Sequence, residues 1–569
     1  MGLTMSFDPD LTELLGDAEV LPASTEAIPA PATVAAVAGA SGGVQHDGAK
    51  TFDQLALWRP QKFSADAELI PEKDMLDARA SDMLRNDAFV SGGARIWKDS
   101  IVGAKFMLNA QPSTKVLWGR EDDVWEEEFQ EEVETKFDLW AESQYHWPDS
   151  EAKKTLTELV RLGVGTFVAG GEIVALADWM PRGDQRPFRT ALQMIDADRL
   201  SDPLDQGAYR NPRMRKGVEV DARGRPIAYY FRNTHPSEGP YHDWTLIQNQ
   251  QWTRIPANRP WGRQNVLHIF EQNRPAQSRG VSAISSALTE MRMFKHLNKT
   301  QLQKAVIAAT YATSIEAELP QDINAALGAG YSADGNATTQ WMLDYLNAVQ
   351  EYSGGAKNLH MAGATIPVMP PGATLNVQNP GTVGPDYEPY VASILRYIAS
   401  SFDLSYEQFS RDYTNTNYSS ARASIGEMWK SMQVRKKMVA DRTASFVYTL
   451  WLEEAINRNQ IETLKRPNAP KFYEGLNSVA YTRCEWIGAG RGMIDPLKET
   501  QADALALKNG LDTKESVIAR RSGQDWRRVG KQIQRERMND ERLGNSSVYE
   551  MENTDAENAL SGTPQERES

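Results

Sequence analysis

Three aspartates stand close together in the first half of the chain and could hold metal ions. Asp196, Asp198 and Asp202 offer carboxylate oxygens, and a two-metal nuclease needs such ligands around a pair of cations. The same residue type also caps turns, and Pro203 follows directly. No histidine lies near these residues in the sequence. Turn capping is therefore the favoured interpretation, and we expect no metal site and no catalytic residue here.

A second group with chemical potential is a set of cations on a predicted helix. Arg292, Lys295 and Lys299 lie three and four residues apart, so a helix would place them on one face. Such a stripe is most often a solvated surface, but it also suits contact with an acidic partner or with a phosphate backbone. The spacing does not choose between these possibilities.

Motifs that would indicate a motor or a metalloprotease are missing. The sequence has no Gly-x4-Gly-Lys-Ser/Thr loop for a nucleotide phosphate and no His-Glu-x-x-His zinc pair. Gly488, Gly490 and Gly492 lack the strand–loop–helix context of a phosphate-binding loop. The histidines are scattered and Cys484 is the only cysteine, which excludes an intramolecular disulfide and a thiolate zinc cluster. The sequence therefore predicts no cofactor.

Length and charge bound the architecture. A chain of 569 residues is too long for one compact core, so several domains are expected. No run of 18 apolar residues occurs, so no membrane span is expected. The net charge of −14 disfavours a tight, non-specific grip on DNA. It does not disfavour a conduit for DNA, because each neutralised phosphate adds affinity and therefore drag.

The cations lie within the most clearly patterned stretch of the chain. Residues 266–270 form a short apolar run that predicts a buried strand, and Asn273, Pro275 and Gly280 predict a turn after it. Ser282 is placed to cap the helix that follows, because its hydroxyl can accept a hydrogen bond from an orphan amide. Apolar residues then recur at helical spacing.

The turn resembles a motif of the phage portal proteins of the lambda type. In that family a strand, an Arg-Pro-x-Gln-x-Arg-Gly-Val-Ser turn and a long helix follow one another. The matching residues of this chain are Arg274, Pro275, Gln277, Arg279, Gly280, Val281 and Ser282. The resemblance covers about residues 52–543. It implies an α+β phage portal fold with a mixed wing domain, a helical stem, a small clip, a long crossing helix and an α-helical crown.

The resemblance and the punctuation of the sequence together divide the chain into parts. Both ends are polar and acidic, which predicts disorder there. The expected parts are a disordered acidic arm (1–50), an α+β wing (51–281), a first stem helix (282–313), a clip (314–384), a second stem helix (385–404), a tunnel loop (405–419), a long helix with the rest of the wing (420–489), a crown (490–545) and a disordered tail (546–569).

Local patterns predict further elements within these parts. Trp125, Phe129, Val133 and Phe137 recur every four residues among acids, which predicts an amphipathic helix. The other expected elements are a helix over 151–162 that ends at Gly163 and Gly165, a turn between strands at 170–172, strands at 218–220 and 227–231, a long helix from Ser419 or Ser420 to about residue 459, an irregular connector over 468–485, and three helices that start at Asp495-Pro496, Thr513 and Asp525.

The resemblance implies a structural role in a virion. About twelve copies of the chain would form a ring at one vertex of a capsid, through which double-stranded DNA is packaged and ejected. The ring would nucleate head assembly among major capsid protein or scaffold subunits, dock the terminase large subunit, and later hold a head–tail adaptor. Terminase would supply the energy. Assembly would take place in the host cytoplasm, with no membrane partner.

The resemblance also implies a loop that contacts DNA. Residues 405–420 occupy the place of the portal tunnel loop, which in the family forms the narrowest part of the channel. The residues expected to line it are Asp412, Tyr413, Thr414, Asn415, Thr416 and Asn417. Most are polar and uncharged, which suits weak contacts, and Arg411 can offset Asp412. Tyr413 and Tyr418 would anchor the two ends of the loop or stack on each other.

The alternative function is a DNA-processing enzyme, either a metal-dependent nuclease or a packaging ATPase. The missing phosphate-binding loop and the scattered carboxylates disfavour this alternative. The native mass discriminates between the two: a ring of about twelve chains indicates a portal, and a monomer with metal-dependent cleavage indicates an enzyme.

Overall fold

The computed structural model describes residues 57–181, 186–203, 211–237, 251–311, 347, 359–361, 364–366, 387–414, 416–466, 468–493 and 495–544. The chain divides into two units, residues 1–62 and 63–569, and the elements below belong to the second. The predicted arm and tail, and most of the predicted clip, lie outside the described residues.

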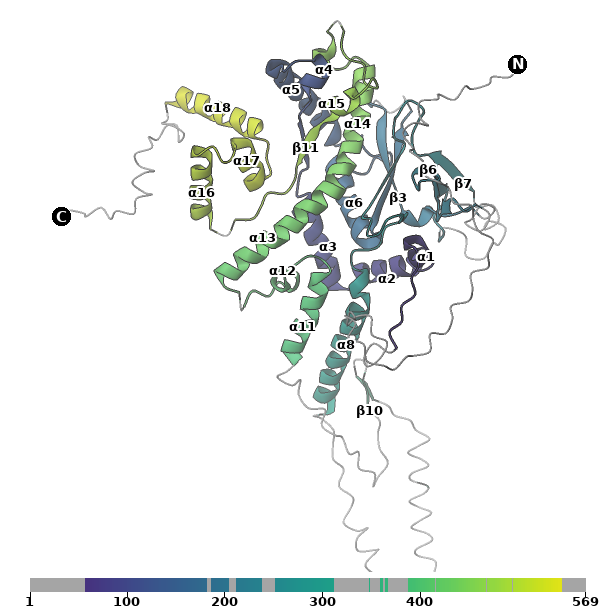
Figure 1. Ribbon diagram of the computed structural model, residues 1–569. Helices are drawn as coiled ribbons and strands as arrows, with labels where there is room; N and C mark the ends of the chain where they lie inside the picture. The colour runs from purple at the N-terminus through teal and green to yellow at the C-terminus, as the bar shows by residue number, and fades with distance from the viewer. Residues whose placement is uncertain are drawn as a thin grey trace, which may run out of the picture. The chain divides into compact units, whose positions relative to one another are not determined.

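Helices and strands alternate irregularly along the second unit, as in an α+β protein (Figure 1). The first elements are α1 (Ala65–Leu69), α2 (Lys73–Asn86), α3 (Ala88–Ile101), β1 (Met107–Ala110), α4 (Thr114–Trp118), α5 (Asp123–Ala141), α6 (Leu156–Gly170), β2 (Glu172–Trp179), β3 (Thr190–Ile195), the 3-10 turn η4 (Ala197–Arg199), β4 (Met214–Arg215), β5 (Val218–Val220), β6 (Pro226–Arg232), β7 (Trp252–Pro256) and β8 (Val266–Phe270).

The second half of the chain is mainly helical. Its elements are the 3-10 turn η5 (Ser285–Ala287), α8 (Leu288–Tyr311), β9 (Leu359–Met361), β10 (Ala364–Ile366), α11 (Tyr387–Ser400), α12 (Tyr406–Ser410), α13 (Tyr418–Arg435), the π-helical segment η6 (Lys436–Asp441), α14 (Arg442–Asn457), the 3-10 turn η7 (Glu462–Leu464), α15 (Asn477–Thr482), β11 (Cys484–Ile487), α16 (Pro496–Lys508), α17 (Lys514–Ser522) and α18 (Trp526–Leu543).

The strands form small antiparallel sheets. One sheet has the order β3-β2-β8 and a second has the order β4-β5-β6-β7. The strands predicted at 218–220, 227–231 and 266–270 are β5, β6 and β8. In the first sheet Glu172 pairs with Phe270 and Val174 with His268. This register brings the start of β2 beside the end of β8. Shortly after β8 comes the turn that resembles the portal motif, residues 274–282, which is called the resembling turn below.

Helix α5 confirms the predicted amphipathic pattern and supplies much of the core. Trp125, Phe129, Val133 and Phe137 are all buried. The ring of Phe137 lies 5.2 Å from that of Trp451 on α14, edge to face. Aromatic pairs in this geometry add to the stabilisation that burial provides, so α5 and α14 form a shared core although hundreds of residues separate them.

Helix α6 differs from the prediction at both ends. It starts after Thr155, which forms a capping box, and it continues through Gly163 and Gly165. A Cβ at Gly163 would lie 3.1 Å from the Ile173 side chain, so this glycine permits close packing instead of ending the helix. The end comes at Gly171, whose φ of 74° is left-handed, and the turn there joins a helix to a strand.

The long helix runs from Tyr418 to Asn457 through α13, η6 and α14 without a break. Its cap is Asn417, which forms a capping box with Ser420, and not Ser419 or Ser420 as predicted. Helix α14 is largely buried, whereas Met432 is the only buried residue of α13. The first half of this helix therefore has little cover within one chain.

Two further predictions are corrected and one is confirmed. The connector predicted over 468–485, with short extended parts, contains the unexpected helix α15, whereas the start of β11, which pairs with the distant β1, agrees with the predicted extended parts. The helix that follows the resembling turn begins at Leu288 after η5, so Ser282 does not cap it. The three C-terminal helices start as predicted, with side-chain caps from Asp495, Thr513 and Asp525.

Candidate functional site

The resembling turn lies on a buried ionic cluster, with Arg279 and Glu172 at its centre. The two side chains are 1% and 0% exposed. Arg279 Nη2 donates to Glu172 Oε1 at 2.6 Å and its Nε donates to Oε2 at 3.0 Å. The guanidinium also donates to the carbonyls of Leu200, Lys216 and Ala197. A planar, forked donor is needed to reach all these acceptors, which explains why the position holds arginine.

A lysine completes the cluster from another helix. Lys73 on α2 is 1% exposed, and its Nζ lies 3.2 Å from Glu172 Oε1 and 2.9 Å from Asp77 Oδ2. The same amine donates to the carbonyls of Gly170 and Gly280. Each buried charge therefore lies beside an opposite charge, and Glu172, Arg279 and Lys73 also bind backbone groups, which is the condition under which buried charges are tolerated.

The electrostatics of the cluster follow from burial and pairing. Burial would raise the pKa of Glu172, but Arg279 and Lys73 outweigh it and hold that pKa well below its ordinary value. Burial raises the pKa of Asp77 to about 6, although Lys73 opposes this. The pKa of His268, whose Nε2 lies 3.0 Å from Glu172 Oε2, is lowered by burial. Every member of the cluster contacts an oppositely charged or ionisable side chain of this chain, which supports a structural role.

Other residues of the resembling turn fix its path. Gln277 accepts hydrogen bonds from the amides of Asn273 and Arg274 and donates to the Arg279 carbonyl. A Cβ at Gly280 would overlap the carbonyl of Gly171. These contacts fix the crossing of the turn over the end of α6. The sequence motif thus encodes a junction that joins the β3-β2-β8 sheet to the helix that follows.

Helix α8 leaves this junction beside α11, and the two lie side by side (Figure 1). Tyr387 Oη donates to Asn298 Oδ1 at 2.8 Å across the pair. Of the predicted cationic stripe, Arg292 and Lys299 are exposed, whereas the amine of Lys295 donates to the Asn86 carbonyl at the end of α2. The structure therefore leaves two cations of the stripe facing outward and uses the third within the chain.

The predicted tunnel loop is shorter than expected, because residues 406–410 form helix α12. Phe409 of α12 is buried, and its ring lies 5.4 Å from that of Phe402. At the other end Asn417 accepts from the Ser420 amide at 2.8 Å as the cap of α13. The turn 411–417 is thus held by a buried aromatic at one end and a capped helix at the other.

The contacts inside this turn differ from those predicted. Asp412 accepts hydrogen bonds from Tyr406 Oη and from the Thr414 hydroxyl and amide, and these bonds, the Thr414 hydroxyl first, lower its pKa. Its hydrogen-bond partners are therefore Tyr406 and Thr414. Tyr413 is 59% exposed, so it does not anchor the loop. Tyr418, at 44% exposed, lies against the Lys498 amine. Thr416 is half-buried, and Asn415 lies outside the described residues.

Of the three aspartates, Asp196 caps a turn as predicted, whereas Asp202 binds an amide that is distant in the sequence. Asp196 accepts from the Asp198 amide and Asp202 accepts from the Gly217 amide. The structure brings His235 to 3.6 Å from Asp198, which the sequence order could not show. Asp196 and Asp198 are exposed, and Asp202 is held elsewhere. Asp196, Asp198 and His235 each place one possible ligand atom within 4.8 Å of the others, so the expected absence of a metal site stays a prediction.

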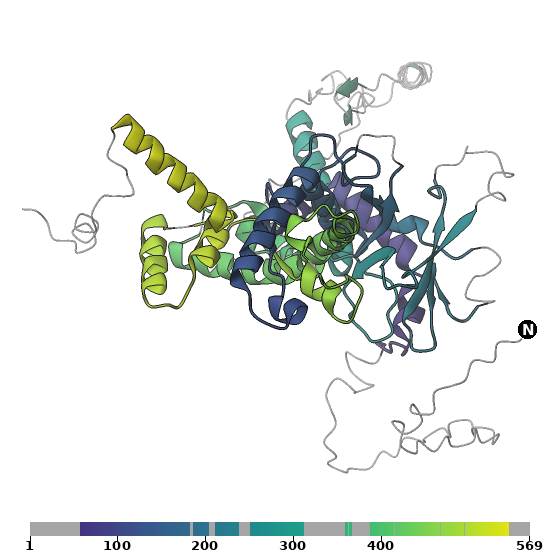
Figure 2. The ribbon, with the colours of Figure 1, turned by 90° about the horizontal axis from the view of Figure 1, so that it is seen from above.

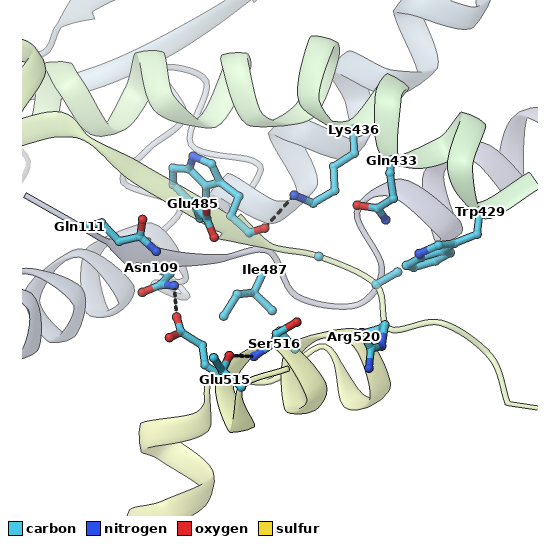
Figure 3. A pocket seen from close by; sticks show the side chains of 15 residues that line it. Asn109, Gln111, Trp429, Gln433, Lys436, Glu485, Ile487, Glu515, Ser516 and Arg520 are labelled. Carbon is cyan, nitrogen blue, oxygen red and sulfur yellow. Dashed lines mark hydrogen bonds between the residues drawn. The ribbon is translucent and has the colours of Figure 1, made fainter. Parts of the chain in front are cut away.

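The glycines at 488–492 lie between strand β11 and helix α16, so the expectation that they lack a strand–loop–helix context is wrong. Gly488 and Gly490 pack against backbone, whereas nothing lies within 4 Å of a Cβ at Gly492. A Cβ at Gly488 would lie 2.6 Å from the Ile101 carbonyl, and one at Gly490 would lie 2.5 Å from that of Arg521. The first of these glycines borders a cleft of about 430 Å³ between α13, β11 and α17 (Figure 3). Lys436 in this cleft is bound to Asp441, so no free cation is offered there by that residue.

Comparison with known proteins gives the class of protein. Residues 52–436 match the family model described as phage portal protein, lambda family. This chain belongs to that family. It is 36% identical over 494 residues to the portal protein of Escherichia phage N15 and 35% identical to portal protein B of Escherichia phage lambda, in each case over 87% of this chain and 89% of the relative. The probable portal protein of Halomonas phage phiHAP-1 is 23% identical over 86% of each chain.

The sequence did not indicate the partners of the resembling arginine. Arg279 was identified by resemblance, but Lys73 and Asp77 carried no signal of their own, because an i,i+4 Lys–Asp pair is ordinary on a solvated helix. The burial of Lys73 follows only from the tertiary fold.

No helix in the part of the chain that the structure describes combines the length and apolarity needed to cross a membrane.

Proposed function

We propose that this protein forms the portal ring of a phage head, with about twelve copies around a channel for double-stranded DNA. The observation that carries the proposal is the family match, which spans most of the chain. The ring would stand at a capsid vertex after assembly in the host cytoplasm. It would nucleate head assembly, bind the terminase large subunit and later a head–tail adaptor, and contact the major capsid protein or scaffold. It would have no catalytic role.

The turn 411–417 is the candidate channel constriction. Arg411, Tyr413, Thr414 and Asn417 are exposed, and the two ends of the turn are fixed by α12 and by the cap of α13. A rigid base with a polar tip can stay close to passing DNA without binding it tightly. The one acid of the turn, Asp412, is engaged with Tyr406 and Thr414, and Arg411 supplies a compensating charge, so net attraction to phosphates remains small.

The test adds charge to the turn without disturbing its ends. Asn417 caps α13 and is therefore left unchanged, since losing a cap costs about 1 kcal/mol. Tyr413→Lys with Asn415→Lys should still form rings in electron micrographs but should package DNA more slowly, most strongly at low salt. Tyr413→Gln with Asn415→Gln is the neutral control. Packaging at the wild-type rate at low salt, or an outward-facing turn in the assembled ring, would contradict this placement.

The predicted clip, residues 314–384, is proposed to carry the terminase contact. Deleting residues 328–355 should leave the rest of the chain folded and abolish terminase binding in a pull-down assay. Packaging by that deletion variant at the normal rate would refute the assignment.

A further inference from the structure

Helix α18 is strongly basic although the chain as a whole is acidic. It contains six arginines or lysines and three acids, in a chain of net charge −14. Arg528, Arg535 and Arg542 recur every seven residues and so share one face. All three are exposed, and none forms an ion pair with any residue that the structure describes. Met538 and Leu543, 58% and 67% exposed, lie on the same half of the helix.

The contacts that the structure describes between α18 and α5 lie in the first half of α18. Arg527 donates to Gln130 on α5 and lies 3.7 Å from Glu134, and Lys531 pairs with Glu131. Beyond this contact α18 runs away from α5 (Figure 2). Arg535 and Arg542 lie in the second half of α18, are exposed, and form no ion pair with the residues that the structure describes.

Helix α5 presents the complementary surface at its start. Asp123 and Glu127, one helical turn apart, are exposed and form no ion pair within the described chain. Val124, 69% exposed, lies beside them. The two acids on α5 are opposite in charge to Arg535 and Arg542 on α18. The exposed apolar side chain of Val124 can likewise pack against Met538.

We propose that the distal half of α18 docks on the start of α5 in a neighbouring copy of this chain, with Arg535 and Arg542 facing Asp123 and Glu127. The inference rests on the proposed ring. In a head-to-tail ring every subunit presents both surfaces once, so each acidic face meets one basic face. A second copy is favoured over DNA because the exposed acids of α5, close to α18, would repel a phosphate backbone and need cations of their own.

Charge reversal tests the pairing. Arg535→Glu with Arg542→Glu should reduce the fraction of chains in rings, measured by native mass spectrometry at fixed concentration, at least tenfold. Asp123→Lys with Glu127→Lys should do the same. Combining all four substitutions should restore rings. Lys508→Glu with Lys514→Glu, two exposed lysines of the same three-helix segment, is the control of equal charge change and should leave rings intact.

The other outcomes overturn the inference in distinguishable ways. Rings that survive the arginine reversal refute the interface, and a loss of packaging in those intact rings would instead assign the basic face to DNA. Rings lost but not restored by the combined variant would show that α5 is not the partner. A wild-type chain that forms no ring contradicts the proposed function itself. Circular dichroism of each variant verifies that the chain remains folded.

Discussion

At the scale of single residues, two arginines of the same turn have opposite environments. Arg279 is buried with Glu172, whereas Arg274 is about half exposed and pairs with Glu68 at the surface. Removing one partner of a buried pair leaves an uncompensated charge, and an exposed pair contributes little. Both arginines match the motif, but only Arg279 is expected to contribute strongly to the stability of the fold.

Substituting Arg279 by lysine should destabilise the protein although the charge is kept. A lysine cannot make the paired contact with Glu172 and also reach the three carbonyls, so we expect a loss of about 3–5 kcal/mol. Thermal unfolding at fixed protein concentration measures the effect. Arg274→Lys is the matched control, with an expected change below about 1 kcal/mol. Equal losses for both variants would contradict the structural role of the cluster.

Burial raises the pKa of Glu134 to about 7, with opposition from its bond to the Ala110 amide and from Arg527. The folded state therefore binds more protons than the unfolded state between about pH 4.5 and 7, and wild-type stability falls as the pH rises through this window. Glu134→Gln removes this dependence and should gain roughly 2–3 kcal/mol relative to wild type between pH 4.5 and 8.

Denaturant unfolding across that pH range measures the effect of Glu134→Gln. The exposed Glu427→Gln serves as the control and should follow the wild-type curve. A constant difference between Glu134→Gln and wild type at all pH values would show that the charge of Glu134 is not buried in the assembled protein.

Little of this residue-level detail could be predicted from the sequence. Resemblance selected Arg279 and Gly280, but the burial of Glu172 and Lys73 depends on how α2, α6 and β8 meet. Conversely, Asn417 is predicted to line the channel, and the structure gives it the further role of capping a helix. A cap and an exposed polar residue have the same chemistry, so the sequence alone does not distinguish them.

At the scale of elements, the helix ends show where prediction from the local sequence succeeds and where it fails. The three C-terminal helices were predicted correctly because their caps and stop signals act within a few residues. The end of α6 was placed too early because Gly163 and Gly165 serve close packing against distant side chains. Tertiary contacts of this kind leave no trace in a local pattern.

The neighbouring glycines at the end of α6 provide an element-level prediction. Gly171 has a φ of 74°, and a Cβ there would overlap the Val281 backbone. Gly171→Ala should therefore cost at least about 2–3 kcal/mol, because both the backbone conformation and the packing are lost. At Gly170 nothing lies within 4 Å of a Cβ. Gly170→Ala should be neutral or stabilise by up to about 1 kcal/mol.

Differential scanning calorimetry of the two alanine variants measures this difference. If Gly171→Ala and Gly170→Ala unfold at the same temperature, then the turn at 274–282 crosses α6 less closely than the structure shows. Because the two positions are adjacent, differences in the unfolded chain largely cancel between them.

At the scale of the whole molecule, the parts with little cover point to assembly. Met432 is the only buried residue of α13, and α16 and α18 have none. A helix gains most of its stability from tertiary packing of one face. The long helix is buried along α14 and largely exposed along α13. This distribution fits a subunit whose exposed surface is covered by neighbouring subunits in a ring, as the family match implies.

Two of the three cations of the stripe on α8 are exposed. Lys295 is engaged with the end of α2, so the informative residues are Arg292 and Lys299. Among residues 387–400 of the adjacent α11, Glu388 is the only acid. A neighbouring α11 would thus offer few partners for two cations, which favours a surface that faces phosphates in the channel.

Arg292→Glu with Lys299→Glu should therefore leave ring formation unchanged in native mass spectrometry and reduce the rate of DNA packaging. Because each lost phosphate contact lowers the dependence of binding on salt concentration by roughly one unit of log–log slope, the variant should also respond less to added salt than wild type does. Arg213→Glu with Arg223→Glu, two exposed arginines near the β4-β5-β6-β7 sheet, is the control of equal charge change and should package normally. Loss of rings in the α8 variant would instead place the stripe between subunits, and wild-type assembly with wild-type packaging would make it a solvated face.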